Sequence, residues 1–155
     1  AASLLRPHLV GGGAAIGRQV RDRIEPGLFY PASHYAHALR LRAVVRAEWL
    51  ARAMADADAA LLPALPREVP TIAETTAVAP EDAAALIGDL TIATRGVNYL
   101  GLPALAAPCG VDAAGLPIAF QLVGRPFAEG RILSIADAFQ RASAWHRARP
   151  FPDEE

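Results

Sequence analysis

The sequence predicts an α/β fold in which helices cover both faces of a sheet. Short apolar segments around residues 59–62, 104–107 and 118–123 are bounded by prolines or glycines, as buried strands often are. Stretches with helical apolar spacing lie before, between and after these segments. The segment 118–123 is apolar at almost every position, which is typical of a strand covered on both faces.

The glycine-rich stretch 11–17 is expected to be a plain loop. A dinucleotide-binding fingerprint starting at Gly11 requires a glycine where Ile16 stands, and a phosphate-binding loop requires Gly-Lys-Ser or Gly-Lys-Thr, which the stretch lacks. We therefore predict no nucleotide site here.

A long helix is predicted after this loop. Ser33 is a candidate N-cap, and the helix is expected to reach about residue 55. Leu41, Val45 and Trp49 recur at i, i+4 and form an apolar stripe. The stripe predicts that this helix covers another part of the protein.

The middle of the chain is expected to contain one strand, one loop and two helices. The apolar run 59–62 ends at prolines and is predicted to be a short buried strand. Residues 66–80 have the composition of a loop, and Pro80 with the acidic residues after it opens a helical stretch. Gly88 is expected to divide that stretch into two helices.

The C-terminal part is expected to contain two more strands and a helix. Each strand is entered through a Leu-Pro step, at Leu102 and at Leu116. Asn98 is expected to shape the preceding turn by hydrogen bonding to the backbone, and Gly101 by adopting a positive φ. A helix is predicted over about residues 128–143 from apolar residues at helical spacing: Ile132, Ile135, Ala136 and Phe139.

These strands are few for a sheet that is buried on both faces. Each Leu, Ile or Phe left uncovered forfeits about 1.5 to 3 kcal/mol. A handful of them would exceed a typical total stability of about 5 to 15 kcal/mol. The strands are therefore predicted to be part of a larger sheet.

The composition narrows the possible partners. The 15 basic and 16 acidic residues give a net charge of −1 without a basic stripe, so direct binding of nucleic acid is not expected. The single cysteine allows no internal disulfide and suits a reducing cytoplasm. The sequence has no apolar run of about 18 residues, and its start lacks the pattern of a secretory signal. We expect a cytoplasmic protein that contacts no membrane.

An ordered string of motifs links the chain to a known family. It reads V-R-D-R-I, P-T-I-A-E-T, T-R-G-V-N-Y-L-G-L-P-A, P-C-G, G-L-P-I, Q-L-V-G-R-P-F and W-H-R. The string resembles the C-terminal signature of the amidase family, whose members cut amides with a Ser-cisSer-Lys triad. The resemblance implies that residues 1–155 form the C-terminal third of an α/β/α sandwich with a mixed β-sheet. It places the catalytic Gly/Ser-rich segment and lysine upstream.

The resemblance predicts that the isolated chain is catalytically incompetent. All 15 basic residues are arginine, so no lysine is present to act as the base. None of the serines lies in a Gly/Ser-rich turn; they are Ser3, Ser33, Ser134 and Ser143. The expected partners are the missing N-terminal catalytic portion and, in the complete enzyme, a small-molecule amide. Self-association is left open, and a non-enzymatic binding module and the A subunit of a tRNA-dependent amidotransferase are the alternatives.

The resemblance also suggests substrate-binding positions. In the A subunits of amidotransferases, an arginine of the V-x-x-R-I motif holds the carboxylate of glutamine, and Arg23 matches it. An acidic residue seven places before the motif asparagine, here Asn98, meets the glutamine ammonium, but Thr91 stands at that position. A hydroxyl does not replace that charge, so the chain resembles a stand-alone amidase more than a glutaminase. Shifting the alignment by two residues would bring Asp89 to this position.

Each of these positions also has a structural interpretation. Arg23 has the place of a solvated arginine at a helix end, and Asn98 that of a turn former. Cys109 is expected to be a small core residue rather than a nucleophile. His34 and His37 are spaced to share a helix face, but two ligands do not make a zinc site. No metal and no cofactor are predicted.

Overall fold

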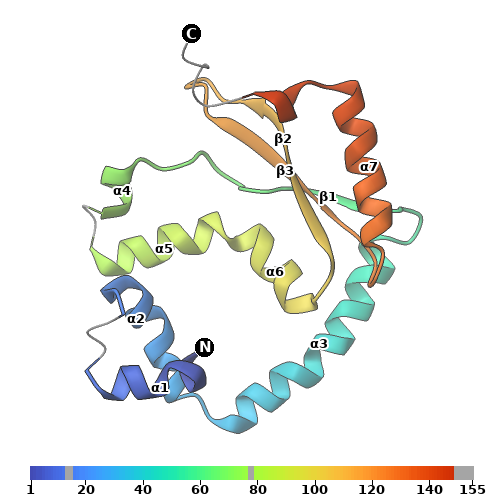
Figure 1. The fold of residues 1–155 in the computed structure, drawn as a ribbon. Coiled ribbons are helices and arrows are strands. Elements are labelled where there is room, and N and C mark those ends of the chain that lie inside the picture. The colour runs from blue at the N-terminus through green and yellow to red at the C-terminus, as the bar shows by residue number, and fades with distance from the viewer. Residues whose placement is uncertain (13–15, 77–78, 149–155) are drawn as a thin grey trace. The chain divides into compact units, whose positions relative to one another are not determined.

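The computed structural model describes residues 1–12, 16–76 and 79–148. The chain forms two compact units, Ala1–Val44 and Val45–Glu155, here called the N-terminal and C-terminal units. Figure 1 shows their elements, and each unit is described by itself. Residues 13–15 of the predicted glycine-rich loop lie outside the described ranges.

The N-terminal unit begins with two short helices and a 3-10 turn. These are α1 (Ala2–Val10), α2 (Arg18–Ile24) and η1 (Glu25–Leu28). No element was predicted over the residues of α1, which contains Pro7 although proline disfavours a helix interior. A Cβ at Gly27 would lie 2.9 Å from the Cβ of Ala2, so the contact of η1 with α1 requires a glycine there.

The long helix α3 (Ala32–Ala53) confirms the predicted helix but not its cap. The backbone N–H of His34 donates to the carbonyl oxygen of Pro31 at 3.0 Å, so the helix is already hydrogen-bonded from Pro31 onward. Ser33 therefore lies in the first turn, and its assignment as N-cap was wrong.

The apolar stripe of α3 is covered only near its C-terminal end. Trp49 and Leu50 pack against a buried cluster of the C-terminal unit. Leu41 and Val45 each remain 41% exposed. The stripe therefore packs against other residues only at the C-terminal end of α3.

The C-terminal unit contains a three-stranded sheet in the order β1-β3-β2. Its strands are β1 (Ala60–Pro63), β2 (Ala104–Val111) and β3 (Pro117–Val123), which confirms the segments predicted from the proline boundaries. The central strand β3 pairs antiparallel with both neighbours, so all pairing within the described sheet is antiparallel. The register of β2 shifts between Pro108 and Gly110, which marks a bulge.

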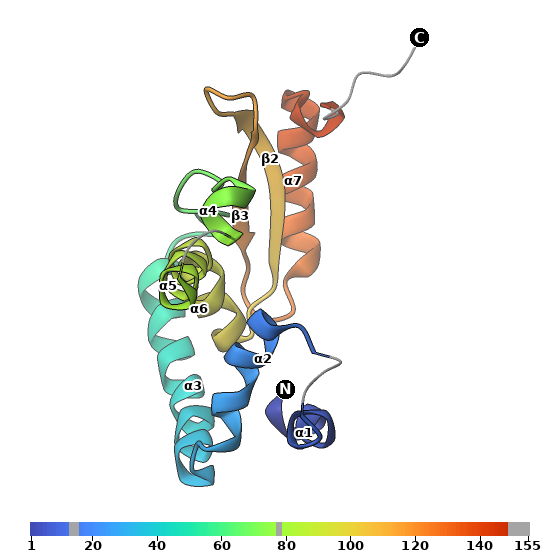
Figure 2. The same cartoon turned by 90° about the vertical axis from the view of Figure 1, so that its left-hand side faces the viewer.

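Helices cover both faces of this sheet, as predicted, and make three layers (Figure 2). The helix α7 (Glu129–Ala142) packs on one face. There the rings of Phe120 and Phe139 pack edge to face, with their centroids 5.0 Å apart. The helix α6 (Ile92–Leu100) and the end of α3 pack on the other face. The buried apolar residues among those described are Met54, Val97, Leu100, Leu102, Ala107, Leu122, Val123, Ile132 and Ala136.

The segment between β1 and α6 differs from the sequence prediction. The expected loop over residues 66–80 contains a short helix, α4 (Ile72–Thr76). Thr71 caps it: its backbone N–H donates to the Glu74 carboxylate at 2.7 Å, and the N–H of Glu74 donates to the Thr71 hydroxyl at 3.2 Å. This is a capping box, so the expectation of a loop was wrong for residues 72–76, while residues 66–71 form no helix or strand.

The helical stretch that begins at Pro80 is divided, but not at Gly88. The helix α5 (Pro80–Leu90) continues through Gly88 and is followed by α6 after Thr91. Thr91 interrupts the helix with φ −102° and ψ 3°. The carbonyl oxygen of Gly88 accepts a hydrogen bond from Nη2 of Arg95 at 2.8 Å.

The sheet is incompletely enclosed. Within the described ranges, β1 and β2 each have an outer edge without a neighbouring strand. Leu61 on β1 is 67% exposed, and Ile118 on β3 is 47% exposed. The C-terminal end of β3 is therefore buried on both faces of the sheet, as predicted, whereas its N-terminal end is exposed.

Candidate functional site

Arg23 lies in the last turn of α2, where its side chain is exposed and lines a cavity of about 1110 Å³ in the N-terminal unit. Tyr30, His34 and Tyr35 from η1 onward line the same cavity, and α1 contributes Ser3. A guanidinium and phenol groups are side chains that can hold a carboxylate through hydrogen bonds, although the Asp22 carboxylate lines the same cavity.

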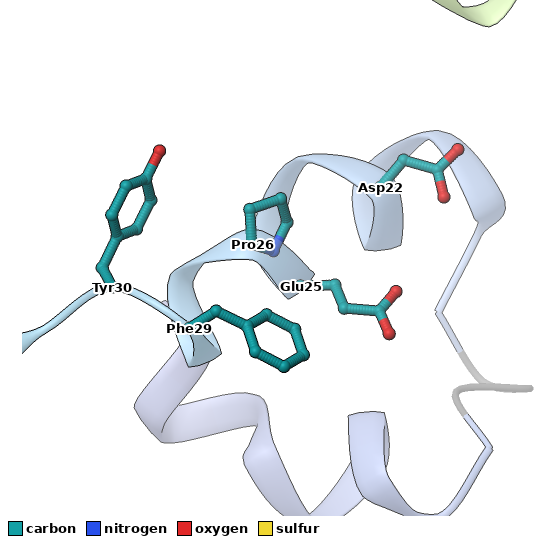
Figure 3. Close-up of a pocket in the computed structure, with 5 residues that line it drawn as sticks. All are labelled: Asp22, Glu25, Pro26, Phe29 and Tyr30. Atoms are coloured by element: carbon teal, nitrogen blue, oxygen red, sulfur yellow. The ribbon is translucent and has the colours of Figure 1, made fainter.

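A second hollow of about 540 Å³ lies next to this cavity (Figure 3). Glu25 and Phe29 extend to the same side of η1, and the ring of Tyr30 points away from them. Asp22 also lines the hollow. It forms an ion pair with Arg18, whose Nε lies 3.7 Å from Oδ2 of Asp22. The Phe29 and Tyr30 side chains are 80% and 70% exposed, so this hollow is shallow and encloses no ligand.

The hydroxyl of Thr91 is already engaged at the junction of α5 and α6. It donates to the carbonyl oxygen of Ile87 at 2.7 Å, and the side chain is half-buried. Because the Thr91 hydroxyl donates its hydrogen to the preceding turn, only its oxygen lone pairs remain to accept a hydrogen bond from a ligand. A cationic amine would meet no full negative charge at this residue.

The alternative acid, Asp89, is paired with a cation. Its carboxylate lies 3.6 Å from Nη1 of Arg67, and both side chains are largely exposed. Such a surface pair contributes little to stability. The pair nevertheless places the positive charge of Arg67 beside Asp89, the acid that the two-residue alignment shift would bring to the position of Thr91.

Asn98 lies in the last turn of α6 and is exposed. Its backbone carbonyl accepts the N–H of Gly101 at 3.3 Å, and Gly101 adopts φ 67°, which confirms the positive φ predicted there. Thr91 precedes Asn98 by about two helical turns, so the two share one side of α6. Arg23 belongs to the other unit, and the role of all three as substrate contacts stays a prediction.

Sequence reasoning missed Gln121, the buried polar residue of β3. It is 4% exposed, and its Nε2 donates to the carbonyl oxygens of Pro63 at 3.2 Å and Ala93 at 3.3 Å. The amide thereby ties the end of β1 to the first turn of α6. One polar residue in an otherwise apolar strand was the signal that could have revealed it.

The other candidate groups are not assembled for catalysis. The Ser134 hydroxyl donates to the carbonyl oxygen of Gly130 at 2.9 Å, as a helical serine commonly does. Cys109 is half-buried at the bulge of β2. His34 and His37 are exposed on α3. Over the described residues, no group of three His, Cys, Asp or Glu side chains is placed to hold a metal ion.

The layers of the C-terminal unit define an α/β protein with helices on both faces of its sheet. The family model described as Amidase matches residues 12–133, and the chain belongs to this family. Within the described ranges, none of the helices is both long and apolar enough to cross a bilayer.

Two of the most similar curated relatives are described as the A subunit of glutamyl-tRNA(Gln) amidotransferase. The protein of Bordetella avium is 33% identical over 86% of this chain and 26% of its own length. That of Roseiflexus sp. is 36% identical over 89% of this chain and 28% of its own length. The chain therefore spans little more than a quarter of these relatives.

Solved structures show the same fold. A protein described as an amidase superposes with a TM-score of 0.75 at 25% identity, over 92% of this chain and 32% of its own. The glutamyl-tRNA(Gln) amidotransferase A subunit of Thermotoga maritima superposes with a TM-score of 0.57 at 28% identity, over 86% of this chain and 29% of its own.

Proposed function

We propose that residues 1–155 form the C-terminal part of an amidase that hydrolyses carboxylic amides to an acid and ammonia or an amine. The observation that carries the proposal is the superposition on a solved amidase, with a TM-score of 0.75 over 92% of this chain but only 32% of the other. An N-terminal part would supply the nucleophilic serine, the second serine and the lysine of the family triad.

The chemistry supports this division of labour. Amide hydrolysis needs a nucleophile, donors for the oxyanion and a proton for the leaving amine. With no lysine in the sequence and Ser134 bonded to its own helix, this chain offers no activated serine of the family type. Its contribution would be to complete the sandwich and to line the substrate pocket with Arg23, Thr91 and Asn98.

We further propose a preference for neutral amides over glutamine. Thr91 offers a hydroxyl that is bonded to Ile87, and Asp89 is paired with Arg67. Neither presents an unpaired carboxylate to an ammonium group. A cytoplasmic location fits the single cysteine of the sequence.

The second candidate is the A subunit of a tRNA-dependent amidotransferase. The relatives at 33% and 36% identity carry that description, which favours it. The two functions differ in one measurable property, because the amidotransferase component releases ammonia from glutamine and a stand-alone amidase need not.

The test begins with the DNA upstream of this sequence. An in-frame segment with the Gly/Ser-rich signature and a lysine is expected. The chain should then show no amidase activity alone, and it should become active towards neutral amides when co-expressed with that segment. Inactivity of a properly folded assembly towards every amide tested, or lack of such a segment, would refute the proposed function.

A further inference from the structure

The turn between β3 and α7 contains an aromatic residue in an unusual backbone conformation. Phe127 has φ 61°, the only positive φ of a non-glycine residue in the described part of the chain. Its side chain is 95% exposed. A bulky residue rarely adopts the left-handed region, since its Cβ crowds the backbone.

Both features are unfavourable in this chain taken alone. A left-handed phenylalanine stores strain, and an exposed phenyl ring gains nothing from burial. A glycine would relieve the strain, and a polar residue would remove the exposed apolar surface. Strain of this kind persists where the surrounding structure holds it in place.

The surrounding structure does hold the turn firmly. On the N-terminal side of Phe127, the N–H of Gly124 donates to the carbonyl oxygen of Pro103 at 2.9 Å. The side chain of Arg125 donates to the carbonyl oxygen of the fully buried Met54. On the C-terminal side of Phe127, the N–H of Ala128 donates to the carbonyl oxygen of Arg125 at 3.0 Å. Figure 1 shows this turn beside the C-terminal end of α3.

Packing restricts the turn as well. A Cβ on Gly124 would lie 2.9 Å from Cγ2 of Ile132, so the backbone of the turn lies directly against α7. Arg131, in the first turns of α7, pairs with Asp58 at 2.9 Å. The exposed ring is therefore presented by a rigid support.

The charged residues close to Phe127 in the chain bear on the kind of partner that its ring fits. The guanidinium groups of Arg125 and Arg131 are engaged by Met54 and Asp58 within the same unit. The neighbouring acid is Glu129, which opens α7. The two arginines nearest to Phe127 in the chain are thus already partnered and offer no free cation to a phosphate, so the exposed phenyl ring suits an apolar protein pocket better than a phosphate-bearing surface.

We propose that Phe127 is a docking anchor whose ring inserts into an apolar pocket on the N-terminal part of the amidase. The inference rests on the proposed function. The solved amidase matched over 92% of this chain extends far beyond the match, which covers only 32% of it, so most of that fold lies outside these residues. A rigid, exposed aromatic residue is the kind of side chain that dominates binding at protein interfaces.

The test measures binding of this chain to the co-expressed N-terminal part. Phe127→Ala and Phe127→Gly should weaken binding about 10- to 100-fold, the range expected for truncating an interface anchor. Phe127→Leu should keep most of the affinity, because it restores apolar volume. Circular dichroism of each variant checks that the chain remains folded. As a matched control, Glu129→Gln changes a neighbouring exposed residue and should leave binding within about twofold.

The outcomes separate this inference from the proposed function. If the wild-type assembly is active and the Phe127 variants bind equally well, the anchor is refuted and the proposed function stands. If the wild-type assembly neither forms nor hydrolyses amides, the proposed function itself fails. If the chain alone dimerises and Phe127→Ala abolishes the dimer, the occupant is a second copy and the proposal is overturned.

Discussion

The hydroxyl of Thr91 donates a 2.7 Å hydrogen bond to the carbonyl oxygen of Ile87, one helical turn earlier. This bond satisfies a carbonyl at the end of α5 where the helix is interrupted. It also consumes the one proton that Thr91 has to offer a substrate. The same residue thus shapes the junction of α5 and α6 and brings no negative charge of its own to it.

Thr91→Asp should therefore change specificity in the assembled enzyme. The new carboxylate would attract the ammonium group of glutamine, and we expect kcat/KM for glutamine to rise about tenfold relative to a neutral amide. Thr91→Asn, which has similar size and no charge, is the control. Efficient use of glutamine by the wild type, equal to that of a neutral amide, would contradict the stand-alone assignment.

The isolated chain should not react with a fluorophosphonate serine probe. The sequence contains no lysine to act as the base of the family triad, and the Ser134 hydroxyl is bonded to Gly130. Intact-mass measurement after labelling should show only the unmodified protein. A stoichiometric adduct on any of its serines would mean that a nucleophile is activated within this chain.

Gln121→Met should destabilise the C-terminal unit by about 1 to 3 kcal/mol, because it removes the donor shared by Pro63 and Ala93 while keeping the volume. Urea unfolding of the assembled enzyme, followed by circular dichroism, measures the change. Gln140→Met, a half-buried position on α7, is the control and should cost less. Equal effects at both positions would show that the Gln121 hydrogen bonds contribute nothing special.

The capping box of α4 should respond to pH. The Thr71 backbone N–H, then its hydroxyl, and more weakly the charge of Arg67, hold the pKa of Glu74 below its ordinary value. A lowered pKa in the folded state means that this contribution is present above the ordinary carboxyl pKa of about 4.3. It is lost as the pH falls through the lower folded value.

A carboxyl NMR titration tests this effect. Thr71→Val removes the hydroxyl and should raise the pKa of Glu74 part of the way back. Thr75→Val is the control, since the Thr75 hydroxyl donates to Ile72 and does not touch Glu74. An unchanged Glu74 pKa in Thr71→Val would show that the hydroxyl has no influence on it.

The free chain should associate with itself, bind a hydrophobic dye or melt without cooperativity. Its sheet has open edges among the described strands, and Leu61 and Ile118 on the sheet are 67% and 47% exposed. Open edges and apolar patches recruit partners. Light scattering and a thermal melt at micromolar concentration measure this. A monodisperse monomer with a sharp transition and no dye binding would favour an independent binding module.

The sequence by itself determined the elements that local rules specify. The Leu-Pro steps at Leu102 and Leu116 located β2 and β3, because proline fixes φ and removes a donor at a strand entrance. Helical spacing located α7, with Ile132 and Ala136 buried as expected. The T-I-A-E capping box at Thr71 was equally readable, and overlooking it cost the prediction of α4.

Tertiary structure alone decided the features that depend on distant neighbours. The interruption falls at Thr91 rather than at Gly88, which stays helical despite the weak helix preference of glycine and whose carbonyl oxygen accepts a hydrogen bond from Arg95. Gln121 is buried because carbonyls on β1 and α6 converge on it. Phe127 adopts a left-handed conformation because contacts far along the chain fix its turn. A local pattern specifies which residues form a strand or helix, but only the folded chain brings remote groups close enough to override a residue's own preference.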